Sequence, residues 1–480
     1  MVIENKDASN SAAQTELLAA FGKRDDVAER EANASGQGIT IPTAPGSLSA
    51  TGLSSSFLLE LMLKVFHYVE GPTTEHLAKV MCLPIKLVNE LLEVLKTDRL
   101  IEIIGGAQYG VSTAYKFRLT EKGEGRAEHA LERCRYAGAA PVTLEQYERV
   151  IGGSDAGRWR PSVSMIKESF KELILDDTTA DILERALHSG RSLMLYGPSG
   201  NGKTTVLTEF IKHLDGEVLI PNALYAYGQI IRMFDGMVHK RVETEPKGEN
   251  GDGNGARGAE EGPDRRWVRV KRPGLIVGGE FTEESLELGY DPITRFYQAP
   301  KHLKAQGGVL VVDDFGRQKV SPSDLLNRWI MALERGRDNL LLRTGESIDV
   351  PFHLTILFST NLNPSDLTDS AYLRRVPYKA YMAPADSARF AEILGLAITK
   401  CWWEAQTDAV AAVAKFLEVA TSGDLSGSLA RDLVMIVLDN AAHEGCEPAF
   451  NVAAFDLAYR QFTGILDGER QATTTAAAQQ

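Results

Sequence analysis

Apolar and polar residues follow different periods in different regions of the chain. From residue 165 to 385, short apolar runs typical of strands alternate with segments of helical period. The strand-like runs include SLMLY, EVLIP, GVLVV and LTILFS, and a helix is expected from Thr204. This alternation indicates an α/β fold with a mainly parallel sheet flanked by helices. From 386 to 467 the period is helical throughout, which predicts a helical domain.

Residues 53–136 show a different order of elements. Three helical segments come first: SSSFLLELMLKVFHYVEGP, TTEHLAKVMCL and PIKLVNELLEVLKTD. Two strand-like runs within 101–120 and a helix at 121–134 follow. Three helices followed by a β-hairpin resemble a winged helix-turn-helix domain.

The remaining segments lack such periodicity. Residues 1–52 are rich in Ala, Ser, Gly and Thr, and 468–480 are similar, so both are expected to be disordered tails. Residues 137–164 are expected to form a linker. The stretch EPKGENGDGNGARGAEEGP, 245–263, predicts a flexible insertion because strand-like WVRV and GLIVGG resume directly after it.

Composition narrows the class of protein. The chain has 480 residues, 44% apolar and 24% charged, with a net charge of −13 and a pI near 5.3, which argues against a protein that coats nucleic acid. Four cysteines without a CxxC pair predict free thiols in a reducing compartment. The sequence shows no apolar run near the ~20 residues of a membrane span and no secretory signal, so we expect a cytoplasmic protein without membrane insertion.

The segment GPSGNGKTT matches the GxxxxGK[ST] pattern of a phosphate-binding loop. It follows the strand Leu193–Tyr196 and opens a helix, the context that this motif requires. Glycines let backbone N–H groups surround phosphate oxygens, Lys203 supplies a positive charge, and the Thr204 hydroxyl is a ligand for Mg²⁺. ATP and Mg²⁺ are therefore the expected cofactors. The candidate nucleotide-binding residues are Gly197, Pro198, Ser199, Gly200, Asn201, Gly202, Lys203, Thr204 and Thr205.

Two adjacent carboxylates end the apolar run GGVLVVDDFGRQ. Burying a carboxylate without a partner costs several kcal/mol, so the pair needs an explanation. Beside a phosphate-binding loop, Asp313 would hold Mg²⁺ together with Thr204. Asp314 would then orient and polarise the water that attacks the γ-phosphate.

The order of motifs in 165–466 resembles that of AAA+ ATPases, and is similar to the MoxR-type branch. GPSGNGKTT, LVVDDFGRQ, NLLLRTGESIDVP, ILFSTNLNP, AYLRRVP and SLARDL match Walker A, Walker B, a hairpin, sensor 1, an arginine finger and sensor 2 in the family's order. The resemblance implies an AAA+ P-loop NTPase core with a helical lid. One departure is that Walker B usually ends in Asp-Glu, whereas Asp314 is one methylene shorter.

The resemblance also implies further catalytic residues. Asn361 matches sensor 1, with Asn363 as a weaker candidate. Arg374 and Arg375 both match the arginine finger that reaches a neighbouring subunit, and the sequence does not say which of them is the finger. Arg431 matches sensor 2. The expected catalytic set is Asp314, Asn361, Arg374, Arg375 and Arg431.

The implied function is Mg-dependent ATP hydrolysis by a ring-forming, chaperone-like machine that remodels a protein complex. A finger acting in trans requires an assembly, which we expect to be a ring of six subunits. Tyr225 and Tyr227 lie where AAA+ unfoldases carry an aromatic loop that grips substrate in the pore, although tyrosines are also common in cores and turns. The client cannot be identified from the sequence.

The winged helix leaves a DNA-binding alternative open. Residues 53–136 contain eleven Lys/Arg and eleven Asp/Glu, so the domain is neutral and offers little phosphate neutralisation. Lys116 and Arg118 are its only suggestive basic pair. A protein-docking role is therefore favoured, and a DNA-associated AAA+ factor whose winged helix binds duplex DNA is the alternative.

Overall fold

A computed structural model describes residues 40–105, 115–152, 159–242, 262–367 and 373–464. Apart from residues 40 and 41, these belong to one compact unit, Pro42–Gln480. The predicted tail 468–480, residues 1–39 of the predicted N-terminal tail, and nearly all of the predicted insertion 245–263 lie outside the described residues.

A five-stranded parallel sheet is formed by strands from residues 193–381. Its strand order is β16 (Tyr378–Tyr381), β4 (Leu193–Tyr196), β15 (Thr355–Thr360), β12 (Val309–Val312) and β9 (Gly274–Val277). Strand β4 comes first of these five in the sequence and lies between β15 and β16. Because β4, β15 and β12 pair in parallel, their carboxyl ends lie at the same edge of the sheet. The fold is therefore the predicted α/β P-loop NTPase core.

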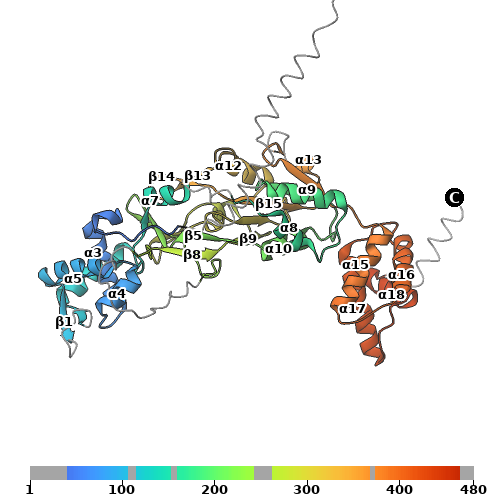
Figure 1. The fold of residues 1–480 in the computed structure, drawn as a ribbon, viewed down its shortest axis with the longest axis horizontal. Coiled ribbons are helices and arrows are strands. Elements are labelled where there is room, and N and C mark those ends of the chain that lie inside the picture. Colours follow the sequence, from blue (N-terminus) through green and yellow to red (C-terminus); the bar gives the residue numbers. More distant parts are fainter. Residues whose placement is uncertain (1–39, 106–114, 153–158, 243–261, 368–372, 465–480) are drawn as a thin grey trace, which may run out of the picture. The chain divides into compact units, whose positions relative to one another are not determined.

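Side chains alternate along each strand, so the sheet presents apolar residues on both of its faces. Helices cover both faces. Leu310 and Val312 of β12 point into one apolar cluster with Trp329, whereas Val309 and Val311 point into another. The first cluster is covered by α12 (Pro322–Arg335), and the second by the helices that Figure 1 shows near β15. These are α8 (Val163–Phe170), α9 (Asp177–His188) and α10 (Lys203–Lys212).

A second five-stranded sheet was not predicted. Its order is β10 (Gly289–Asp291), β11 (Phe296–Gln298), β7 (Gln229–Arg232), β6 (Ala223–Ala226) and β3 (Val142–Thr143). The strands come from three distant segments and are mostly three or four residues long, too short for an alternating pattern to show.

The prediction that residues 137–164 form a linker is wrong in part. This segment contains strand β3 and the helix α7 (Leu144–Tyr147). The Tyr147 side chain is completely buried and stacks on Trp267, with ring centroids 6.2 Å apart. This buried aromatic ring therefore anchors the segment to the strand that begins at Trp267.

The run EVLIP was expected in the parallel sheet, and this expectation is wrong. It forms β5 (Glu217–Pro221), which pairs antiparallel with β8 (Trp267–Lys271). The GLIV run forms β9 and takes the place beside β12. A second antiparallel pair, β13 (Arg337–Leu341) and β14 (Ser347–Pro351), is the hairpin expected before sensor 1. An apolar run of four or five residues carries no information about which distant strand it will pair with.

The N-terminal domain contains the expected helices and hairpin. Ser54, Thr73 and Thr120 each begin a helix, and their hydroxyls accept a hydrogen bond from a backbone N–H of the first turn. The elements, in order, are α3 (Ser55–Tyr68), α4 (Thr74–Met81), α5 (Ile85–Thr97), β1 (Ile101–Gly105), β2 (Lys116–Leu119) and α6 (Glu121–Arg133).

This domain shares its core with the second sheet. Ala223, Ile230 and Phe296 belong to the same buried apolar cluster as α3, α4 and α5. The Phe57 ring packs on Tyr225, with centroids 4.7 Å apart. The predicted boundary at residue 136 therefore does not separate two cores.

Residues 42–52 are ordered, contrary to the prediction of disorder for 1–52. Thr51, in a 3₁₀ turn Ser49–Thr51, is completely buried, and its carbonyl accepts a hydrogen bond from Arg266 at 3.1 Å. Arg266 also forms a buried ion pair with Asp264, whose backbone N–H donates to the Pro42 carbonyl at 2.7 Å. These hydrogen bonds to the backbone hold the segment in place without an apolar stripe, so its sequence showed no periodicity that would predict order.

The C-terminal domain is helical, as predicted. Its helices, in red at the end of the colour scale of Figure 1, are α15 (Ser387–Lys400), α16 (Thr407–Ala420), α17 (Gly427–Glu444) and α18 (Val452–Thr463). Phe390, Leu433 and Phe455 are completely buried in its core. We call this domain the lid.

None of the helices in the described part of the chain has both the length and the apolar character to cross a membrane. All four cysteines are described, and each is a free thiol.

Candidate active site

The predicted phosphate-binding loop connects β4 to α10. Gly197, Gly200 and Gly202 have φ angles of 143°, 82° and 84°, in the left-handed region that favours glycine. Gly202 precedes α10 and has no side chain to cap it, so the first backbone N–H groups of the helix remain available. A helix N-terminus with free N–H groups is suited to bind phosphate.

Close packing fixes the loop in place. A Cβ atom on Gly197 would lie 2.4 Å from the Met382 carbonyl oxygen, and one on Gly200 would lie 2.3 Å from Ser428 Oγ. The Asn201 side-chain N–H also donates to Met382 at 3.1 Å, whereas its buried Oδ1 has no hydrogen-bond partner among the described residues. The loop therefore lies between the residue after β16 and the first turn of α17. Ser199 and Thr205 are exposed.

Lys203 lies inside this loop with only 5% of its surface exposed. Its Nζ donates to the carbonyl oxygens of Gly197 at 2.9 Å and Pro198 at 2.7 Å. Burial lowers the pKa of the ammonium, whereas the Asp314 and Asp313 carboxylates oppose this shift. A phosphate group would replace these two carbonyl partners with a stronger, charged one.

Thr204 and Asp313 meet as the sequence predicted. The Thr204 hydroxyl donates to the two carboxylate oxygens of Asp313, at 2.9 and 3.0 Å. Thr204 lies on α10, which follows β4, and Asp313 follows β12. Strand β15 lies between β4 and β12, and all three strands run parallel, so their carboxyl ends lie on the same side of the sheet. A hydroxyl and a carboxylate are oxygen ligands of the kind that Mg²⁺ prefers, so the pair fits this ion.

Asp314 and Asn361 form a second pair. The Asn361 side-chain N–H lies 3.4 Å from Asp314 Oδ1, and Asp314 is exposed. Asp314 has a φ of 50°, which turns the chain sharply at the end of β12. Among the described residues, Asn363 contributes its backbone carbonyl to the Asp366 amide, whereas the Asn361 side chain contacts Asp314.

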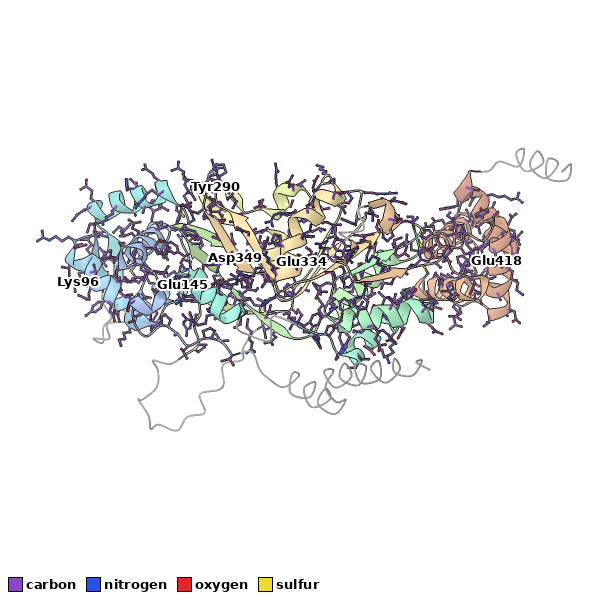
Figure 2. All side chains as sticks on the ribbon, turned by 90° about the horizontal axis from the view of Figure 1, so that it is seen from above. Lys96, Glu145, Tyr290, Glu334, Asp349 and Glu418 are labelled. Atoms are coloured by element: carbon purple, nitrogen blue, oxygen red, sulfur yellow. The ribbon has the colours of Figure 1, made fainter. Side chains whose placement is uncertain are left out.

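The two candidate finger residues have different surroundings. Arg375 forms an ion pair with Glu334 on α12, at 2.7 Å, and Figure 2 labels this glutamate. Arg374 is exposed and has no ion-pair partner among the described residues.

Arg431 lies on α17, but its guanidinium pairs with the adjacent Asp432 at 3.2 Å and is 73% exposed. The helix itself does reach the site: the Ser428 backbone N–H donates to the Gly200 carbonyl at 3.0 Å. The structure thus brings the start of the lid helix to the loop, and leaves the predicted sensor 2 side chain directed at its neighbour.

Sequence reasoning missed two residues that support the site. Ser428 joins the lid to the loop, and Gln318 hydrogen-bonds to the backbone of Asp313 and Gly316. Ser428 is the first residue of the SLARDL motif, so its place in that motif could have indicated that it lies near the loop. Gln318 carried no signal beyond standing four residues after Asp314.

The two tyrosines considered for a pore loop also differ. Tyr225 lies in β6 and is half-buried against Phe57, so it is not available to grip a substrate. Tyr227 is 62% exposed, at the turn between β6 and β7. Only Tyr227 keeps the exposure that a pore residue needs.

No protein-family model matches the sequence, and no curated protein matches it. Among solved structures, NtrX from Brucella abortus is similar over 61% of this chain and 52% of its own, with 13% identity and a TM-score of 0.35. Domain III of the Thermotoga maritima replication initiation protein DnaA is similar over 62% of this chain and 97% of its own, with 12% identity and a TM-score of 0.35.

The Thermotoga maritima RuvB Holliday junction branch migration motor is similar over 66% of this chain and 76% of its own, with 14% identity and a TM-score of 0.33. The match to NtrX spans about half of that protein, 52%. At TM-scores this low the likeness does not bear on function, and the fold assignment rests on the sheet order and the phosphate-binding loop.

Proposed function

We propose that the protein is a Mg-dependent ATPase of the AAA+ type. The observation that supports this best is the meeting of Thr204 with Asp313, at 2.9 Å, beside the buried Lys203 and the pair of Asp314 and Asn361. Nucleotide hydrolysis requires a lysine that binds phosphate, a pair of metal ligands and a group that positions the attacking water. These residues could supply all three.

Each residue has a defined role in this proposal. The loop amides and the Lys203 ammonium bind the β- and γ-phosphate oxygens of ATP. Thr204 and Asp313 would hold Mg²⁺, which neutralises charge on the phosphates when bound. Asp314 accepts a proton from the attacking water, whose oxygen bonds to the γ-phosphorus while the bond to the ADP oxygen breaks. Asn361 orients the same water.

An assembly completes the site. We propose that Arg374 acts on the γ-phosphate of a neighbouring subunit, since it is exposed while Arg375 is paired to Glu334. A planar guanidinium suits this role because it spreads positive charge over several phosphate oxygens. A homo-oligomeric ring of six subunits would give every site a finger.

We expect the Lys203→Met variant to lose ATP turnover and to bind ATP at least about tenfold more weakly, because the phosphates lose their main positive charge. Phosphate release and titration with a fluorescent ATP analogue would measure the two effects. Lys212→Met, which removes an exposed lysine from the same helix, is the matched control. ATP turnover unchanged in Lys203→Met would refute the proposed function.

We further propose that the machine is MoxR-like and remodels a protein complex, with the N-terminal domain as its docking part. The exposed face of α5 combines Ile85 with Lys86, Glu90 and Glu93, which line a shallow, open depression of the surface. Of the basic pair that suggested DNA, Arg118 is neutralised by Glu102 at 2.5 Å. This surface is better suited to a protein than to a phosphate backbone.

We therefore expect no binding of a duplex oligonucleotide at about 50 mM salt, since a neutral surface releases few counterions. Fluorescence anisotropy over a salt series measures this. A steep decrease of affinity with salt, abolished in a Lys116→Glu variant, would instead support the DNA-associated alternative.

A further inference from the structure

The turn that carries both aspartates is closed by the side chain of Gln318. Its Nε2 donates to the Asp313 carbonyl oxygen at 2.6 Å, and its Oε1 accepts from the Gly316 amide at 2.8 Å. One carboxamide thus bridges the backbone from Asp313 to Gly316. A carboxamide, which only glutamine and asparagine carry, places a donor and an acceptor side by side, and asparagine is one methylene shorter.

This turn needs external support because its backbone is unusual. Asp314 has a φ of 50° and Gly316 a φ of 103°, so two of three consecutive residues lie in the left-handed region. A non-glycine residue persists there only when surrounding contacts hold it, although aspartate tolerates it better than most residues. The left-handed conformation sets the direction of the Asp314 carboxylate.

Other contacts hold a different part of the turn. The Phe315 amide donates to the Ser359 carbonyl at 2.7 Å, and the Phe315 carbonyl accepts from the Thr360 hydroxyl at 2.6 Å. These bonds fix the middle of the turn to β15. The Gln318 bonds fix both of its ends, the carbonyl before Asp314 and the amide of Gly316.

We propose that Gln318 is a positioning residue for ATP hydrolysis. By fixing the backbone on both sides of Asp314, it keeps this carboxylate within reach of Asn361 and keeps Asp313 aligned with Thr204. The inference rests on the ATPase function proposed above. Gln318 acts through backbone atoms, so it is not itself a catalytic residue.

A positioning role predicts a selective effect on the chemical step. Displacing a catalytic group by about 1 Å can slow a reaction about 100-fold. The phosphate-binding loop makes no hydrogen bond to Gln318, so ATP affinity should be kept. In Gln318→Leu we expect kcat to fall about 10- to 100-fold, with ATP affinity within about threefold of the wild type.

The experiment compares three full-length variants with the wild type. Gln318→Leu removes both hydrogen bonds. Gln318→Glu keeps the acceptor for the Gly316 amide and loses the donor to Asp313, so its kcat should also fall while ATP affinity is kept. Lys319→Leu places the same new side chain on the next, exposed residue and is the matched control. Steady-state kinetics, ATP titration and thermal unfolding are measured for each.

The outcomes separate this inference from the ATPase function. A kcat loss without loss of ATP affinity, absent in Lys319→Leu, supports the inference. If the wild type hydrolyses ATP and Gln318→Leu keeps kcat within about threefold, the positioning role is refuted and the ATPase function stands. If Gln318→Leu unfolds, the kinetics of Gln318→Glu decide between the outcomes. A loss of ATP affinity in Gln318→Glu as large as its loss of kcat would refute the positioning role. A wild type without ATP turnover refutes both proposals.

Discussion

The Asp314→Asn variant should bind ATP like the wild type and hydrolyse it about 10²- to 10⁴-fold more slowly, the range for loss of a general base. The amide cannot accept the proton of the attacking water. Asparagine also tolerates the left-handed backbone at this position, so the variant should fold as the wild type does. Phosphate release and nucleotide titration measure the two quantities.

The matched control is Asp408→Asn, which makes the same change at an exposed position in the first turn of α16. Turnover by Asp314→Asn within about threefold of the wild type would mean that another residue positions the water. Loss of ATP binding in the same variant would place Asp314 among the nucleotide ligands instead.

The second large effect is the loss of kcat expected when the proposed arginine finger is removed. We expect Arg374→Ala to lower kcat about 10³-fold or more, as removal of an arginine finger does, while ATP binding is kept. Arg375→Ala should cost less, because this side chain pairs with Glu334 of its own subunit at 2.7 Å. The reverse order of the two effects would identify Arg375 as the finger.

Mixing two inactive variants tests whether the finger acts in trans. A subunit with Asp314→Asn still offers Arg374, and one with Arg374→Ala still offers Asp314. In a randomly mixed ring about a quarter of the sites would combine both functional residues, so activity should reappear. Activity that stays absent after mixing, with rings confirmed by light scattering, would contradict a finger in trans.

Local patterns were enough to predict the centre of the site. Lys203, Thr204, Asp313 and Asn361 each follow a buried strand or open a helix, and the carboxyl ends of neighbouring parallel strands meet. The motif GPSGNGKTT and the carboxylates that end the run GGVLVV led us to expect Thr204 and Asp313 to lie together, and the structure joins them at 2.9 Å.

The features that were missed depend on contacts between distant segments. The second sheet joins Val142 to Leu224 and Tyr297 to Ile231, pairs that no local pattern can reveal. Gln318 was missed for another reason. Its role comes from two backbone atoms of a turn whose left-handed residue, Asp314, does not look unusual in the sequence.

The shared core of the N-terminal domain has a consequence for synthesis on the ribosome. Helices α3 to α6 leave the exit tunnel before the second sheet does, and the side chains that complete their core, among them Ile230 and Phe296, are translated up to 160 residues after Tyr136. Until then the Phe57 and Tyr136 rings lack their partners on the second sheet. The core of this domain is therefore completed late, and a nascent chain that stalls during translation of residues 245–263 would expose this apolar surface to chaperones.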